Sequence, residues 1–441
     1  MDTLFSNITA VTMSDKLPVV LGAYVGVTQG KISYISQTPP QEPAARTIDG
    51  RGMVLMPGLI NCHAHLPMTP LRGYGDDHNL SDWLNHYIFP KEELWDDRAI
   101  RAATLLGLAE CLRFGTTSVS DMYYFSDTVC QCVAESGIKG NISRSVTAFS
   151  QDFDFETYPA CRELVALTEK WNGYDNGRIK VEASIHAEYT SFDKVWHALA
   201  EYAINSGIGM QIHVSETQNE HDSCLEKYGL TPTQLMDVYH VWDTRALAAH
   251  CVWLTEEDMD LFARRGVTAV HCPNSNLKLA SGIAPVRKLL DKGVNVALGT
   301  DGVSSSNNAD LFEAVKLAAL LSNGSTLDPT SLTAQEALRL ATLSGAKAQG
   351  RAQECGMIAP GLDADLIMLD FTQPHLIPCH NPVSNLVYAA SGHDVCLTMV
   401  RGKILYENGT YPTIDLQGVL REFHDYVIPL MFGPGKEQIN G

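Results

Sequence analysis

Histidine and aspartate residues with the chemistry of metal ligands occur at separated points of the chain. His63 and His65 form an H-x-H pair, and on a strand this spacing points both imidazoles to the same face. His213 supplies a third nitrogen donor and Asp301 an oxygen donor. Three imidazoles with a carboxylate suit a catalytic Zn²⁺ ion and equally an Fe²⁺ ion. These four residues are therefore the predicted ligands of a divalent cation. The alternative for the dipeptide alone is a fortuitous surface pair.

Three residues have the chemistry to move protons beside such a cation. Glu216 follows His213 by an odd offset, so the chain must turn after the strand before this carboxylate can act as a general acid and base. The alternative is a helix start with Ser215 as N-cap and an acid in the first turn. His250 is predicted to orient the attacking water, with a buried structural histidine as the alternative. Asp301 could orient the same water or accept its proton.

Short apolar runs precede these polar residues and alternate with amphipathic segments through the middle of the chain. Eight such runs occupy residues 54–62, 116–121, 139–146, 180–186, 208–213, 247–250, 267–271 and 294–301. The alternation predicts an α/β fold with a parallel sheet covered by helices. Eight units favour a closed (β/α)₈ TIM-type barrel, in which the carboxyl ends of all strands meet on one face. The alternative is an open, doubly wound sheet.

Both ends of the chain have a different, strand-rich pattern. Short alternations of apolar and polar residues, separated by glycine-containing turns, are typical of β-hairpins. Because chain termini often lie close together, residues 1–55 and 360–412 are predicted to form one small composite β-sandwich. Residues 56–359 would then form the barrel. Residues 413–441 are predicted to be a C-terminal helical extension.

The overall composition limits the classes of partner. The chain has 441 residues, of which 45% are hydrophobic, so a folded globular protein is expected. The formal net charge of −19 argues against nucleic acid and acidic membrane surfaces as partners. Eleven scattered cysteines show no disulfide framework, and no apolar window is long enough to span a membrane. We therefore expect a reduced, cytoplasmic protein, with a homo-oligomer left open.

Several motifs together resemble those of the amidohydrolase superfamily. The matching segments are PGLINCHAH at 57–65, HVSE at 213–216, AHC at 249–251, HCPNSNLK at 271–278 and LGTDG at 298–302. Within the superfamily they are most similar to the branch of S-adenosylhomocysteine/5′-methylthioadenosine deaminases. The likeness extends to GLDADL at 361–366 and so covers nearly the whole chain.

The resemblance implies contacts to a nucleoside substrate. It assigns the ribose hydroxyls to Glu92 in the FPKE segment, a wall of the base pocket to Trp83, and the substrate tail to Arg144. His186 becomes a further substrate contact, and Glu216 contacts the base while it moves the proton.

Two departures from the family pattern bear on the substrate and the metal. Glu188 replaces the usual proline after His186, and a second tail-binding arginine matches only loosely near Arg162, which puts the binding of a free amino-acid carboxylate in doubt. Binuclear relatives carry a bridging lysine where this chain has His186. The resemblance therefore implies one divalent metal ion per chain, Zn²⁺ with Fe²⁺ as the alternative.

The implied activity is hydrolytic deamination of a 6-aminopurine nucleoside, such as S-adenosylhomocysteine, 5′-methylthioadenosine or adenosine. Water adds to the carbon that bears the amino group while Glu216 protonates the adjacent ring nitrogen, and ammonia then leaves an inosine-type product. One alternative is an aminohydrolase of another N-heterocycle, such as guanine, a pterin or an s-triazine. Another is a barrel that has lost its metal and its catalysis.

Overall fold

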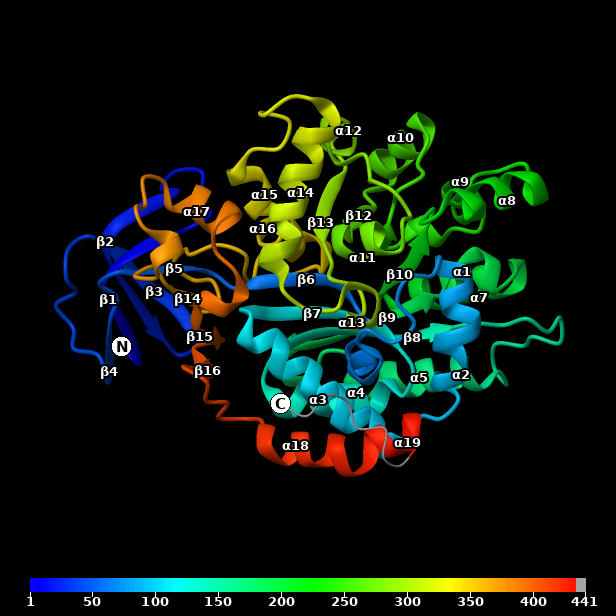
Figure 1. The fold of residues 1–441 in the computed structure, drawn as a ribbon, viewed down its shortest axis with the longest axis horizontal. Helices are drawn as coiled ribbons and strands as arrows, with labels where there is room; N and C mark the ends of the chain where they lie inside the picture. The colour runs from blue at the N-terminus through cyan, green and yellow to red at the C-terminus, as the bar shows by residue number, and fades with distance from the viewer. Residues whose placement is uncertain (434–441) are drawn as a thin grey trace.

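Two eight-stranded sheets organise the chain, one closed into a barrel and one lying beside it (Figure 1). This computed structural model describes residues 1–433. The last residues of the predicted C-terminal extension, 434–441, lie outside the described part. Within residues 1–433 no helix combines the length and the apolar character needed to cross a membrane.

The barrel consists of parallel strands that follow one another in chain order. They are β6 (Leu59–Ala64), β7 (Thr116–Tyr123), β8 (Lys139–Val146), β9 (Ile179–Ile185), β10 (Gly209–Val214), β11 (Ala246–His250), β12 (Thr268–His271) and β13 (Asn295–Leu298). The circle closes where Ala64, at the end of β6, forms a parallel bridge with Asp301, just beyond β13. The predicted α/β barrel is confirmed, and the open doubly wound sheet is wrong.

Helices lie between and after these strands, and the longer ones cover the outside of the barrel (Figure 1). The longer ones are α3 (Asp97–Arg113), α4 (Ser126–Ser136), α5 (Pro159–Trp171), α7 (Asp193–Ser206), α8 (Gln218–Tyr228), α10 (Glu256–Arg265) and α14 (Leu311–Thr326). The shorter ones are α1 (Leu80–Trp83), α2 (Phe89–Glu92), α6 (Tyr174–Gly177), α9 (Pro232–Val238), α11 (Pro273–Lys278), α12 (Val286–Asp291), α13 (Val303–Ser306), α15 (Ala334–Leu340), α16 (Leu343–Ala348) and α17 (Pro382–Tyr388).

Helix α10 illustrates how the local sequence fixes these boundaries. The Thr255 hydroxyl accepts a hydrogen bond from the backbone N–H of Asp258, whose own position in the first turn favours the positive helix N-terminus. Arg264 and Arg265 lie in the last turn, and Gly266 then ends the helix at φ +71°.

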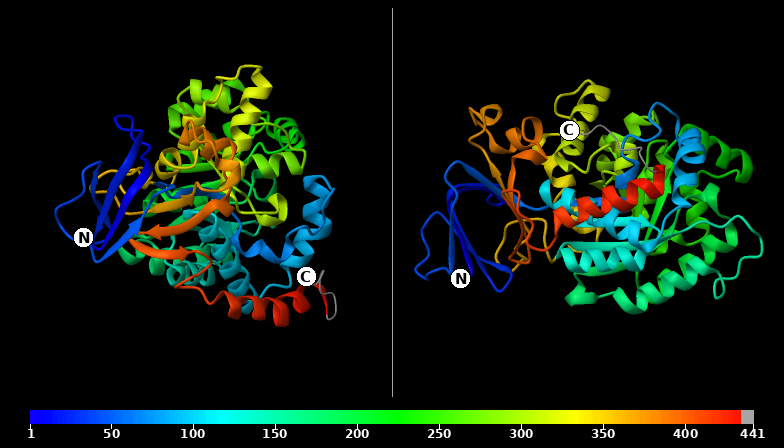
Figure 2. Two further views of the ribbon diagram at one scale, coloured as in Figure 1. Left: turned by 60° about the vertical axis from the view of Figure 1, so that its left-hand side comes forward. Right: turned by 60° about the horizontal axis from the view of Figure 1, so that its bottom comes forward.

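The second sheet joins the two ends of the chain. Its strands are β1 (Thr3–Val11), β2 (Val19–Thr28), β3 (Lys31–Ser36), β4 (Arg46–Asp49), β5 (Met53–Pro57), β14 (Leu366–Asp370), β15 (Val395–Val400) and β16 (Lys403–Glu407). β5 pairs with β1 on one side and with β14 on the other, so the N- and C-terminal flanks form one composite, as expected. Figure 2 shows this sheet at one side of the barrel. The exact domain limits stay a prediction.

The first apolar run, 54–62, does not form a single strand as the sequence suggested. It divides at Gly58, so that β5 belongs to the flanking sheet and β6 to the barrel. A Cβ atom on Gly58 would lie 2.1 Å from the Thr117 side chain, and the Gly58 N–H donates to the Asp365 carbonyl at 2.9 Å. The change of sheet therefore requires a residue without a side chain.

The C-terminal helical segment packs along the barrel. It consists of α18 (Leu416–Glu422), a π-helical turn (Phe423–Val427) and α19 (Ile428–Phe432), and it runs beside α3 in Figures 1 and 2. The Arg98 guanidinium of α3 lies 3.8 Å from the centre of the Tyr426 ring. An aromatic face thus holds a cation at this contact.

A buried ion cluster ties the barrel to the flanking sheet. The Lys139 ammonium, fully buried at the start of β8, lies 2.8 Å from Asp363 and 2.6 Å from Asp365, just before β14. Lys31 of the flanking sheet also contacts Asp363 at 2.8 Å, but its side chain is 56% exposed. Burial would raise the pKa of Asp363, but the charge of Lys139 lowers that pKa to about 2. Removing the buried lysine would leave the Asp365 carboxylate without its ion-pair partner, whereas Asp363 would keep Lys31 and Arg401.

We expect Lys139→Met to lower the free energy of unfolding by about 3–5 kcal/mol, because it leaves the buried Asp365 carboxylate without its ion-pair partner. Urea unfolding followed by circular dichroism measures the change. Lys31→Met is the matched control, since it removes an exposed partner of Asp363 and should cost less than about 1 kcal/mol. Equal losses in the two variants would contradict the assigned role of Lys139.

Candidate functional site

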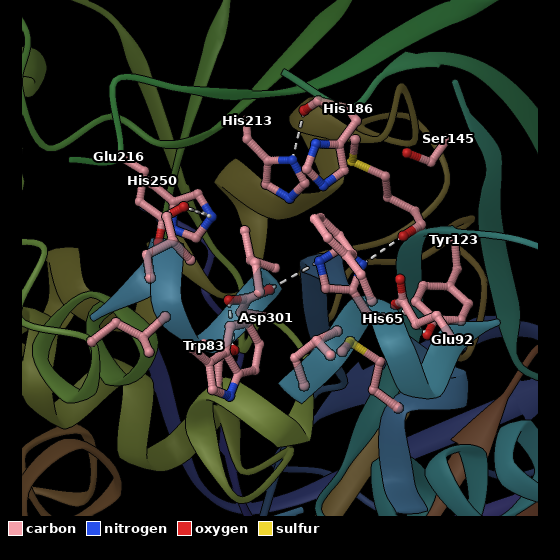
Figure 3. Close-up of a pocket in the computed structure, with 18 of the residues that line it drawn as sticks. His65, Trp83, Glu92, Tyr123, Ser145, His186, His213, Glu216, His250 and Asp301 are labelled. Carbon is pink, nitrogen blue, oxygen red and sulfur yellow. Dashed lines mark hydrogen bonds and ion pairs between the residues drawn. The ribbon is translucent and has the colours of Figure 1, made fainter. Parts of the chain in front are cut away.

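Histidines and carboxylates gather at the carboxyl ends of the barrel strands (Figure 3). The residues at or just beyond these ends are His63, His65, His186, His213, His250, His271 and Asp301. All are buried except His65 and His186, which are partly exposed. Active sites of α/β barrels are built on this face.

The predicted ligands meet at one point. Ligand atoms of His63, His65 and His213 lie within 4.8 Å of one another, as do those of His63, His250 and Asp301. The Asp301 Oδ1 atom lies 3.4 Å from His63 Nε2 and 3.1 Å from His65 Nε2. His63 Nε2 is buried and has no hydrogen-bond partner. A cation at the centre would supply one, so the donor set fits a divalent metal ion.

Backbone carbonyls orient two of the imidazole rings. Nδ1 of His65 lies 2.5 Å from the Met122 carbonyl, and Nδ1 of His213 lies 2.7 Å from the His186 carbonyl. Because a carbonyl only accepts, each Nδ1 must donate its proton. In the neutral ring, Nε2 is then left with a lone pair directed at the cluster, as metal-ligating histidines require.

Two serines orient Asp301. The hydroxyls of Ser275 and Ser305 donate to Oδ2 at 2.6 and 2.7 Å, which leaves Oδ1 to face the histidines. Burial opposes a charged imidazole at His65, but Asp301 raises the pKa of that histidine to about 9. Burial instead lowers the pKa of His63 to about 4 and also lowers that of His213, so these two rings favour the neutral form that binds a metal ion.

Glu216 and His250 form a pair at the edge of the cluster. His250 Nε2 lies 3.6 Å from Glu216 Oε2, and Ser281 donates to Glu216 Oε1 at 3.4 Å. Nδ1 of His250 lies 2.9 Å from the side-chain oxygen of Asn276, which fixes the ring. Burial raises the pKa of Glu216. A carboxyl group whose pKa moves toward neutrality suits both uptake and release of a proton.

A tight turn after β10 brings Glu216 over the cluster. Ser215 adopts a left-handed conformation, with φ +49°, which is unfavourable for a residue with a side chain. The Glu220 carboxylate accepts the N–H groups of Ser215 and Glu216 at 2.5 and 2.7 Å and so holds the turn. The turn that the sequence required is therefore present. The alternative of Ser215 as N-cap is wrong, since Thr217 caps α8.

A cavity beside the cluster is lined by most of the predicted substrate contacts. Glu92, Trp83, His186 and Glu216 all line it, together with Tyr123. The Tyr123 hydroxyl donates to Glu92 at 2.6 Å, and burial raises the pKa of Glu92 to about 7. Figure 3 shows Trp83 and Glu92 on opposite sides of His65.

Arg144 is not among the residues that line this cavity. Its guanidinium forms an ion pair with Glu163 and lies 5.1 Å from the centre of the Tyr124 ring. Arg162 is exposed on α5. The contact of Arg144 with the substrate tail stays a prediction.

Several residues that shape the site were not assigned from the sequence. They are Tyr123, Ser275, Asn276, Ser305 and Glu220. For Glu220 a signal exists, because Thr217-x-x-Glu220 is a capping-box pattern and the structure forms that box. The serines and Asn276 give no comparable local signal.

A parallel α/β barrel that gathers imidazoles and carboxylates at the carboxyl ends of its strands has the arrangement of a barrel enzyme. The family model of the amidohydrolases matches residues 54–405. The chain belongs to this amidohydrolase family, which confirms the resemblance and the prediction of a hydrolase acting on C–N bonds.

Individual relatives cover almost the whole chain. A 5′-deoxyadenosine deaminase of Methanosarcina mazei is 40% identical, over 96% of this chain and 96% of its own. A 5-methylthioadenosine/S-adenosylhomocysteine deaminase of Acetivibrio thermocellus is 40% identical, over 95% of this chain and 97% of its own. The crystal structure of a Xanthomonas campestris adenosine deaminase with bound zinc superposes with a TM-score of 0.90 at 32% identity, covering 97% of this chain and 98% of its own.

The turn at Ser215 can be tested by stability. We expect Ser215→Gly to keep the free energy of unfolding within about 1 kcal/mol of the parent, because glycine adopts a positive φ freely. Ser215→Val should lose about 2 kcal/mol or more, since a β-branched residue is strained there. Urea unfolding of both variants measures this, and a valine variant as stable as the glycine variant would contradict the assigned strain.

Proposed function

We propose that this protein is a metal-dependent aminohydrolase that converts an adenosine-type 6-aminopurine nucleoside to the inosine-type product and ammonia. The observation that carries the proposal is the convergence of four potential metal ligands with Glu216 and His250 at a cavity that also contains Glu92. The names of the relatives supply the substrate class. A small-molecule nucleoside is the partner, and the cytoplasmic location and the oligomeric state remain predictions.

The proposed ligands of the metal are His63, His65, His213 and Asp301. One ion per chain is proposed, Zn²⁺ first, in agreement with the zinc in the Xanthomonas campestris structure. Such an ion lowers the pKa of water toward neutrality and so makes a nucleophile available at neutral pH. The residues of the chain determine where that water reacts.

In the proposed reaction, Glu216 moves protons to the base. Oxygen adds to the ring carbon that bears the amino group, and the adjacent ring nitrogen must gain a proton as the C=N bond opens. Glu216 protonates that nitrogen, and His250 and Asp301 orient the water, one of them accepting the first of its two protons. When the C–N bond to the amino group breaks, the amino nitrogen takes the first proton of the water and leaves as ammonia. The added hydroxyl group returns its remaining proton to Glu216 and becomes the carbonyl.

The remaining cavity residues orient the nucleoside. Glu92 is proposed to accept hydrogen bonds from the ribose hydroxyls, for which its side-chain oxygens and its contact with Tyr123 are suited. Trp83, only 5% exposed, would flank the base, and His186 would contact it from the end of β9. This orientation is the entropic part of catalysis.

We expect Glu216→Gln to reduce ammonia release from 5′-methylthioadenosine by at least about 10³-fold, because the amide cannot transfer the proton. The zinc content, measured by elemental analysis, should stay that of the parent, since Glu216 is not a proposed ligand. Thr217→Ser is the control at the neighbouring position and should retain turnover. A glutamine variant with parental kcat would refute the proton transfer.

We expect His63→Ala and His213→Ala each to lower the Zn²⁺ affinity at least about 10²-fold, because each removes one nitrogen donor. Equilibrium dialysis of the chelator-treated protein against ⁶⁵Zn²⁺ measures this without reference to activity. His197→Ala removes an exposed imidazole on α7 and should bind like the parent. Unchanged binding in both ligand variants would place the metal elsewhere.

A further inference from the structure

A second, larger chamber adjoins the cavity of the proposed active site. Its volume is about 940 Å³. Leu80, Leu84, Phe89, Tyr189 and Leu279 line both spaces. A nucleoside whose base lies at the histidine cluster would therefore extend its distal substituent toward this chamber, which we call the outer chamber.

Acidic side chains outnumber basic ones in the lining of the outer chamber. Asp82, Glu188 and Glu220 line it, and among the described residues of the lining Lys227 is the one lysine or arginine. The Lys227 ammonium lies 4.7 Å from the centre of the Tyr228 ring. Like charges that approach one another across a partly desolvated space repel strongly. A carboxylate entering the chamber would meet this repulsion.

Glu188 is the acid with unused hydrogen-bonding capacity. It is 4% exposed, and its Oε2 atom is buried without a hydrogen-bond partner. Glu220 differs, because its two oxygens already accept backbone N–H groups of Ser215 and Glu216. Buried acceptors without partners are rare in folded proteins. Burial and the neighbouring Glu220 carboxylate raise the pKa of Glu188, so an ammonium group that enters the chamber would stabilise the charged form of this side chain.

The two arginines that were considered for the substrate tail, Arg144 and Arg162, do not line the outer chamber. Arg144 is already paired with Glu163 and packed on Tyr124, and Arg162 is exposed on α5. Neither lines the inner cavity or the outer chamber. The two spaces therefore lack the guanidinium fork that usually binds a carboxylate.

We propose that Glu188 is a specificity-determining residue of the outer chamber, which accepts a 5′ substituent ending in an ammonium or another hydrogen-bond donor and rejects one ending in a carboxylate. This rests on the proposed function, because it concerns the tail of the same nucleoside. Nucleosides with neutral tails such as methylthio should have a kcat/KM between those of the amine and the carboxylate. Glu188 acts on binding of the tail and takes no part in the chemical step.

The test compares adenine nucleosides that differ only at the end of a 5′-alkylthio chain. The probes are 5′-(3-aminopropylthio)-, 5′-(propylthio)- and 5′-(2-carboxyethylthio)-5′-deoxyadenosine, with ammonia release as the assay. We expect kcat/KM for the amine to exceed that for the carboxylate at least about tenfold. The change should appear mainly in KM, because the tail lies away from the reacting carbon.

The variants assign this preference to Glu188. Glu188→Gln should reduce the ratio of amine to carboxylate kcat/KM at least about fivefold, because the amide cannot ionise beside an ammonium tail. Asp222→Asn is the matched control, since it removes an exposed acid from the same helix as Glu220 and should leave the ratio unchanged. Thermal unfolding verifies that Glu188→Gln is folded.

Each outcome bears on the proposal. A parent protein that uses the carboxylate probe as well as the amine probe overturns it, whether or not the glutamine variant folds. An equal change of the ratio in Asp222→Asn overturns the role of Glu188 in particular. If no probe releases ammonia, the proposed function itself fails. If all probes release ammonia with equal kcat/KM, the proposed function stands and only the tail preference fails.

Discussion

The hydrogen bond from the Asp301 N–H to the His63 carbonyl, 2.9 Å long, is the contact on which the site depends. It lies where the end of the last barrel strand meets the first, and beside it the Asn61 side chain both donates to the Thr300 hydroxyl and accepts from the Thr300 N–H. This seam joins residues some 240 positions apart in sequence. Because His63 belongs to one side of the seam and Asp301 to the other, closing the barrel and bringing a carboxylate to the imidazoles are the same event.

Assembling the site opposes stability, and other parts of the fold must compensate. Ser215, His250 and Asp301 have positive φ angles of 49°, 71° and 62°, conformations that residues with side chains rarely adopt. His63 Nε2 and Asp121 Oδ2 are buried without partners. Such costs persist only where the surroundings determine the conformation, which here means two-sided burial of the strands, together with ion pairs at the opposite end of the barrel. The carboxyl ends, where the proposed chemistry takes place, thus carry part of the strain in the fold.

The parts of the structure that repeat could be predicted from the sequence, and the parts fixed by a single close contact could not. The alternation of apolar runs with amphipathic segments predicted the barrel, and polar residues at the strand ends predicted the cluster. The division of the first run at Gly58 depends on the nearby Thr117 side chain, which no local pattern reveals. The serines that hold Asp301 also come together only in three dimensions. The N-cap of α8 is Thr217 and not Ser215, because the turn after β10 extends two residues further than the sequence suggested.

The elements that would recognise the substrate are structurally separate from those that form the seam. Trp83 and Glu92 lie in the long segment between β6 and α3, and Glu188 follows the end of β9. None of the three takes part in a strand pairing of the barrel. Loops of this kind change without altering the register that places the metal ligands. Proteins built on this barrel can therefore share one type of reaction and differ in their substrates. The charge of the outer chamber is then as informative about this chain's own substrate as the histidine cluster is about its reaction.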